Sequence, residues 1–183
     1  TAPNRLASGA MLDPKVFKAY DVRGIHPTEL DEDGAYRIGR AYVEHFDPTA
    51  IAVGRDMRLS SPSMAAAVIE GAADGGADVR DLGLIGTEML YYAVGEQGLD
   101  GGIVVTASHN PKEYTGMKIV RRGALPVGGD SGLEDVRRVA EAGFGETTRR
   151  GEVRPDDVWE GFVAKVLSFV QPDAIRPLRV VID

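Results

Sequence analysis

The sequence has no cysteine in its 183 residues, which excludes a disulfide-stapled scaffold and any metal site built on thiolate ligands. It also has no apolar run near the ~18 residues that a membrane-spanning helix needs. The N-terminus lacks the basic-then-apolar order of a secretory signal. These absences predict a cytoplasmic protein that has no membrane partner.

Positive charge is scarce, because 21 Lys and Arg residues face 28 Asp and Glu residues and the formal net charge is -7. Such a balance argues against binding of nucleic acid or an anionic membrane, since these surfaces attract a basic field. An anionic ligand would need a local gathering of cations. Two candidates are the pair Arg55 and Arg58, and the later group of Lys118, Arg121 and Arg122.

Apolar residues recur at helical spacing in several stretches bounded by capping residues, Gly or Pro, as at the Asp31 start and the Ser60-Ser61-Pro62 start. This spacing predicts helices over residues 31–46, 60–75, 87–95, 131–142 and 155–170.

Short apolar runs between these stretches have the length and composition of strands. They predict strands over 16–20, 50–53, 77–82, 101–106 and 117–120, with a turn at 21–24 after the first. Strands that alternate with helices at this rhythm predict an α/β fold whose sheet is mixed or mostly parallel. Functional residues are then expected in the loops at the strand ends.

The last part of the sequence differs from the rest. Residues 143–154 are rich in Gly, Thr and charge and predict a connector, whereas 178–183 has a buried-strand pattern that stops where the sequence stops. We therefore expect one domain over 1–150, and over 151–183 a linker helix and the first strand of a truncated second domain. An ordinary C-terminal edge strand is the alternative.

Ser108 is the residue that most suggests chemistry, because it follows the strongest strand signal at a point where Ser-His-Asn-Pro turns the backbone. A hydroxyl in this place can carry a phosphoryl group if cations and backbone N–H groups surround the phosphate oxygens. The same four residues are also a common way to build a plain turn. The residues by themselves leave both interpretations open.

Several other enzyme classes are disfavoured. Ser108 and His109 are adjacent in sequence, whereas the members of a hydrolase triad come from distant positions, and no G-x-S-x-G motif surrounds Ser108. No P-loop motif is found, which disfavours a nucleotide kinase. His26, His45 and His109 show no metal-ligand spacing.

Four stretches together resemble the first domain of the α-D-phosphohexomutases, the phosphomannomutase/phosphoglucomutase family. They are Lys18-Ala-Tyr-Asp-Val-Arg-Gly24, Gly54-Arg-Asp-Met-Arg-Leu-Ser-Ser-Pro62, Thr106-Ala-Ser-His-Asn-Pro111 and Gly116-Met-Lys-Ile119. The resemblance covers nearly the whole chain. It implies a layered α/β/α domain, the first of four around a central cleft, with Ser108 phosphorylated in the resting enzyme.

The reaction implied by this resemblance is reversible phosphoryl transfer between the 1- and 6-positions of a hexose phosphate. A hexose 1,6-bisphosphate would be both intermediate and activator. The first motif looks like that of the mannose and glucose enzymes, and the choice between these sugars stays open. This segment alone should be inactive, because the remaining domains would complete the site. A non-catalytic phosphosugar-binding or interaction module derived from a mutase domain is the alternative.

The resemblance also implies roles for individual residues. Ser108 would be the phosphoryl carrier and, through its phosphate, a ligand of Mg²⁺. Lys118 is the candidate general acid or base, and Arg23 a second cation near the phosphate. His109 would orient the phosphoserine or share the proton transfer.

Arg23 and Lys118 would also bind the substrate together with Tyr20, and further residues would support the loop. Tyr20 looks like a substrate-facing tyrosine, with core packing as its alternative. Arg55, Asp56 and Asn110 would support the phosphoserine loop, and an ion pair between Arg55 and Asp56 is an equal alternative to direct contact. One departure is Glu88, where the family usually has proline; it should lie at a helix start and cost no activity.

Overall fold

The computed structural model describes residues 12–182, and its centre is a seven-stranded sheet in the order β1-β5-β4-β2-β3-β7, with β6 beside β5. The strands are β1 (Val22–Ile25), β2 (Ala50–Arg55), β3 (Asp78–Leu84), β4 (Gly101–Val105), β5 (Tyr114–Arg121), β6 (Leu125–Pro126) and β7 (Val153–Pro155). In the described chain β5 runs against the other six, so the sheet is mixed and mostly parallel, as predicted.

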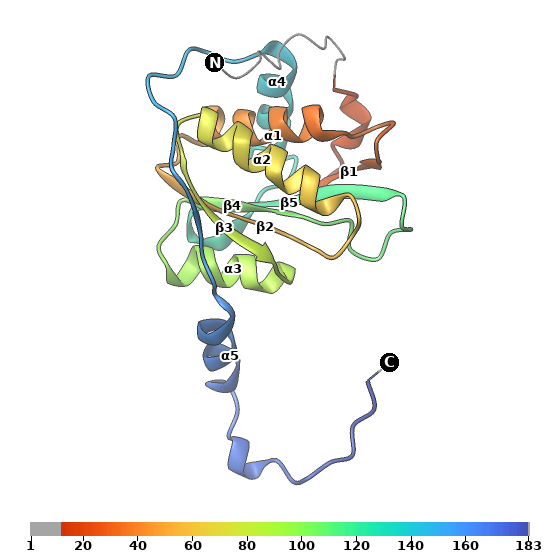
Figure 1. Cartoon of the computed structure of the whole chain (residues 1–183), viewed down its shortest axis with the longest axis vertical. Coiled ribbons are helices and arrows are strands. Elements are labelled where there is room, and N and C mark those ends of the chain that lie inside the picture. The colour runs from red at the N-terminus through yellow and green to blue at the C-terminus, as the bar shows by residue number, and fades with distance from the viewer. Residues whose placement is uncertain (1–11, 183) are drawn as a thin grey trace.

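Helices cover both faces of this sheet (Figure 1). The α-helices are α1 (Glu32–Phe46), α2 (Ser61–Asp74), α3 (Thr87–Glu96), α4 (Leu133–Ala142) and α5 (Trp159–Leu167). Short 3₁₀ turns lie at Pro14–Val16, Arg122–Ala124 and Pro172–Ala174. Helices α1, α2 and α4 lie on one face and α3 on the other, which confirms the layered α/β/α fold.

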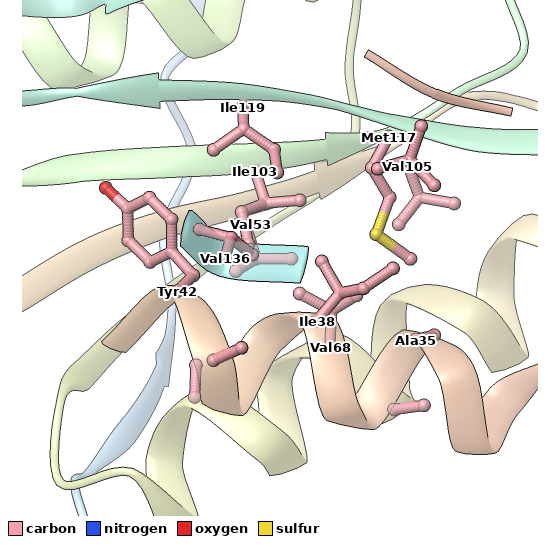
Figure 2. Close-up of a cluster of buried hydrophobic side chains, with 14 of the residues drawn as sticks. Ala35, Ile38, Tyr42, Val53, Val68, Ile103, Val105, Met117, Ile119 and Val136 are labelled. Carbon is pink, nitrogen blue, oxygen red and sulfur yellow. The ribbon is translucent and has the colours of Figure 1, made fainter. Parts of the chain in front are cut away.

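The main core lies between α1, α2, α4 and the sheet (Figure 2). Helix α1 begins as the sequence predicts, because the Asp31 carboxylate accepts a hydrogen bond of 2.9 Å from the Gly34 amide. Its Ile38 and Tyr42 side chains are fully buried against the sheet. This packing fixes the strand ends from which the functional loops leave.

The first predicted strand is wrong, because residues 16–20 do not form one and the expected turn at 21–24 is instead β1. The chain turns earlier, where the Lys18 amide donates to the Asp21 carbonyl at 2.8 Å and Phe17 bridges to Val22. The apolar residues on both sides of the turn are the reason, since Val16 and Val22 are both buried. The correction matters for function, because it places Arg23 on a sheet strand.

The C-terminal part also departs from the prediction. The helix predicted over 155–170 is shorter, since β7 takes Pro155 and α5 begins at Trp159. Residues 178–182 form no strand, and the Ile182 side chain is 92% exposed. A strand needs a neighbour for its backbone groups, and these residues have none in the described chain. Residue 183 lies outside the described residues.

Segment 151–183 is nevertheless tied to the sheet at its start. Strand β7 pairs with β3, Val158 is buried, and the Phe162 ring meets Tyr92 of α3 at 5.8 Å between centroids. A division of the chain at residue 150 therefore stays a prediction. No helix among residues 12–182 has the length and apolar character to cross a membrane.

Candidate functional site

The Ser108 loop, residues 106–113, joins β4 to β5 and is closed by its own side chains. Ser108 has a left-handed backbone with φ of 52°, which non-glycine residues adopt only with support from neighbours. The Thr106 hydroxyl accepts from the Ser108 amide at 2.9 Å, and the Asn110 side-chain amide donates to the Ala107 carbonyl at 2.9 Å. Ser108 is therefore exposed on a well-defined turn.

Arg58 is the main support of this loop. Its Nη2 donates to the carbonyls of Ser108 at 2.9 Å and Asn110 at 2.7 Å. Its Nη1 donates to the carbonyls of Pro111 at 2.8 Å and Tyr114 at 3.2 Å. One guanidinium thus binds four carbonyl oxygens of the loop and its exit into β5, which holds the loop backbone in one shape.

Asp56 holds Arg58 in place. Its carboxylate lies 3.3 Å from Arg58 Nε and accepts from the Ser61 hydroxyl at 2.5 Å and the Arg58 amide at 3.0 Å. Burial by itself raises the pKa of Asp56, but hydrogen bonds from Ser61, Arg58 and Thr106, with the Arg58 charge, outweigh it and lower that pKa. Of the two alternatives for Arg55 and Asp56, the ion pair between them is not formed: Arg58 pairs with the Asp56 carboxylate, and Arg55 donates to the Asp56 carbonyl at 3.4 Å.

This environment gives a pH prediction. A carboxyl whose folded pKa is lowered stabilises the fold above its unfolded pKa of about 3.9, and this stabilisation is lost as the pH falls through the lower folded pKa. Asp56→Asn should therefore lower the free energy of unfolding at pH 7, with a difference from the wild type that shrinks below about pH 4. Urea unfolding from pH 3 to 7 measures this difference. A difference that stays constant or grows on acidification contradicts the prediction.

Two cations lie on neighbouring strands beside the loop. Arg23 on β1 is buried, and its Nη1 donates to the Thr106 carbonyl at 2.6 Å. Lys118 on β5 is partly exposed. The Asp21 carboxylate contacts both, at 2.8 Å from Arg23 Nη2 and 3.7 Å from Lys118 Nζ. The structure therefore brings the predicted cations together through a carboxylate.

The glycine opposite Arg23 makes this arrangement possible. Gly116 pairs with Arg23 across β1 and β5. A Cβ added at Gly116 would lie 2.1 Å from the Val22 carbonyl oxygen and 3.0 Å from Arg23 Cδ. Any larger residue would push Arg23 away from Thr106. The fourth sequence motif thus begins with a glycine for steric reasons.

His109 and Tyr20 are both accessible to a ligand. The His109 Nδ1 lies 3.3 Å from the Ser108 hydroxyl, close enough to orient it. The Tyr20 side chain is 79% exposed, so the alternative of core packing for this residue is wrong. Its neighbourhood is fixed by the 128–129 turn, where the Gly129 amide donates to the Ala19 carbonyl at 2.9 Å.

The surface around Ser108 is hollowed on two sides. One open cavity of about 370 Å³ lies toward the start of α3, and its lining includes Leu84, Gly86, Thr87 and Ser108. A second, of about 600 Å³, lies toward Met57, Leu59, Lys112 and Ser108. Glu88 lies in the first turn of α3, as predicted, near the first of these cavities.

Sequence reasoning missed Arg58 as loop support and Asp21 as a partner of the cations. Both residues lie inside two of the four motifs, Asp21 in Lys18–Gly24 and Arg58 in Gly54–Pro62, but the motifs do not indicate these roles. No group of three His, Asp or Glu side chains within residues 12–182 is placed to hold a metal ion.

Comparison with known proteins gives a clear result. A family model described as "Phosphoglucomutase/phosphomannomutase, alpha/beta/alpha domain I" matches residues 14–145. A phosphomannomutase from Salmonella montevideo is 46% identical over 170 residues, which cover 91% of this chain and 37% of that protein. The chain therefore spans little more than a third of the length of this relative.

Two further relatives support the match. A phosphomannomutase sequence from Klebsiella pneumoniae is 51% identical over 150 residues, covering 80% of this chain and 96% of its own length. The crystal structure of a phosphoglucomutase/phosphomannomutase family protein from Burkholderia thailandensis superposes with a TM-score of 0.79 at 35% identity, covering 86% of this chain and 36% of that one. The sequence comparisons and the fold comparison thus match the same family.

Proposed function

Because the chain belongs to the phosphoglucomutase/phosphomannomutase family as its alpha/beta/alpha domain I, we propose that Ser108 carries the phosphoryl group of a hexose-phosphate mutase. The observation that supports this most is the exposed Ser108 hydroxyl on a turn whose carbonyls are bound by Arg58. Two cations, Arg23 and Lys118, lie on the adjacent strands. Positive groups near a transferring phosphoryl group stabilise its charge.

In the proposed reaction Ser108 gives one phosphoryl group to the sugar and takes the other one from it. The bond between phosphorus and the Ser108 oxygen breaks as a free hydroxyl of a hexose 1- or 6-phosphate bonds to the phosphorus, which yields a 1,6-bisphosphate. The serine then accepts the other phosphoryl group in the reverse sense. Lys118 would take and return the proton of the sugar hydroxyl, Arg23 would bind phosphate oxygens, and His109 would orient the serine.

A magnesium ion fits this proposal in one respect only. Phosphorylated Ser108 would offer it a phosphate oxygen, a ligand type that Mg²⁺ prefers. The described residues supply no further cluster of ligands, so the other ligands would come from outside residues 12–182. When bound, the ion would offset the charge on the transferred group.

We propose mannose and glucose phosphates as the substrates, because the relatives are named phosphomannomutases and the family model names both activities. Residues 1–150 would be domain I and 151–183 a linker helix and the start of domain II. The remaining domains would then be the main partners of this chain, which spans 37% of its Salmonella relative and would not complete a site by itself.

The test is to incubate the natural gene product that carries these residues with glucose 1,6-bisphosphate and to measure intact mass with site mapping. One phosphate on Ser108 is the expected result. A protein that stays unmodified, or that takes the phosphate on another residue, contradicts the proposal.

A further inference from the structure

Asp21 comes one residue before β1, and its carboxylate lies 3.7 Å from Lys118 Nζ of β5. Strands β1 and β5 are antiparallel with Val22 paired to Met117 and Arg23 paired to Gly116. Because the Asp21 carboxylate contacts both cations, the side chains of Asp21, Arg23 and Lys118 lie together at this end of the strand pair.

A single oxygen of Asp21 serves both cations. Its Oδ2 accepts from Arg23 Nε at 3.1 Å and Nη2 at 2.8 Å, and it lies 3.7 Å from Lys118 Nζ. The exposed fractions of these side chains are 16% for Asp21, 10% for Arg23 and 34% for Lys118. Attraction is stronger in such a partly desolvated place than between fully exposed charges.

We propose that Asp21 is a positioning residue of the mutase, which holds Arg23 and Lys118 in fixed places beside Ser108. The inference rests on the proposed function and assigns a further residue to it. The unit is anchored at the carrier loop, because the same Arg23 side chain donates to the Thr106 carbonyl, two residues before Ser108.

The physical reason is like-charge repulsion. The two cations repel each other when they lie close together. Lys118 has the more flexible and more exposed side chain, so without Asp21 it would turn into water to relieve this repulsion. The Asp21 carboxylate between them removes this repulsion, so both cations are in place before the sugar binds. Orientation of reacting groups before the chemical step is a large part of catalysis.

Replacing Asp21 by asparagine keeps the shape and removes the charge. In the natural gene product we expect kcat to fall about tenfold, as for other residues that orient a catalytic group, while KM stays within about threefold because the sugar's own contacts remain. Asp21→Glu keeps the charge and should recover part of the loss.

Asp33→Asn is the matched control. It breaks an Asp–Arg pair of 3.0 Å with similar burial, where the side chains of Arg37 and Asp33 are 15% and 22% exposed, on α1 away from the site. Loss of kcat in both variants to the same degree would mean that Asp21 acts only through folding, and would overturn the proposal.

A double-mutant cycle with Lys118→Met separates positioning from stability. If Asp21 acts through Lys118, adding Asp21→Asn to Lys118→Met should change kcat by much less than it does in the wild type. Additive losses, or an Asp21→Asn variant as active as wild type, overturn the inference. A wild-type protein that is never phosphorylated on Ser108 shows instead that the proposed function itself fails.

Discussion

Ser108→Gly should reduce mutase activity of the natural gene product by at least about 10⁴-fold, the scale on which removal of a covalent nucleophile acts, while leaving the fold intact. The carrier oxygen is lost, and the other hydroxyl of the loop, on Thr106, is buried and accepts from the Ser108 amide. Glycine is the informative replacement because Ser108 has φ of 52°. A left-handed backbone costs glycine little, whereas alanine keeps the strain.

The measurement pairs coupled-assay activity with urea unfolding of Ser108→Gly and Ser108→Ala. Both variants should be inactive, and Ser108→Gly should be at least as stable as Ser108→Ala. Retention of substantial activity by either variant would remove Ser108 from the mechanism. Inactivity together with unfolding of both variants would leave the loss attributable to the fold, and the glycine variant is included to test for that outcome.

Arg58→Lys should cost about 100-fold in kcat, the effect expected when reacting groups shift by about 1 Å. The reason is geometric: the guanidinium donates to the carbonyls of Ser108, Asn110, Pro111 and Tyr114 and pairs with Asp56. A lysine ammonium has three donors on one atom and cannot reach five acceptors at once. The loop backbone would lose part of this support, and Ser108 would shift from its place.

Arg37→Lys is the control for this substitution, because Arg37 is similarly buried and its guanidinium pairs with Asp33 on α1 instead of the loop. Steady-state kinetics and the rate of phosphate uptake by Ser108 are measured in both variants. The Arg58 variant should be slow in both readouts and the Arg37 variant normal. Equal kinetics in the two would show that the loop keeps its shape without Arg58.

The sequence predicts the fold well where local signals and burial agree. The Asp31 cap and the spacing of Ile38 and Tyr42 give α1, and the run 101–106 gives β4. The prediction is wrong where the signal depends on a partner. Residues 178–182 have a strand pattern but no neighbouring strand in the described chain, and 16–20 has apolar residues that pack across a turn.

The site shows the same limit. The resemblance of the motifs to the family indicates Ser108, Lys118 and Arg23. The motifs do not say which arginine of the Gly54–Pro62 stretch reaches the loop. Arg58 does so and Arg55 does not, because of the direction in which the chain continues after β2. Asp21 was missed for a related reason: its role depends on the register of β1 against β5.

Strand β5, which runs against its neighbours β1, β4 and β6, has a mechanical consequence. Val104 pairs with Lys118, so the carrier and its lysine sit on a single hairpin, ten residues apart in sequence and stitched by backbone hydrogen bonds. The distance between Ser108 and Lys118 is therefore set within one hydrogen-bonded hairpin. Motion elsewhere in the protein should change this distance little. Whatever rearrangement brings the sugar into place, Ser108 and Lys118 will travel together, and an insertion of one residue in β5 would turn Lys118 to the opposite face of the sheet.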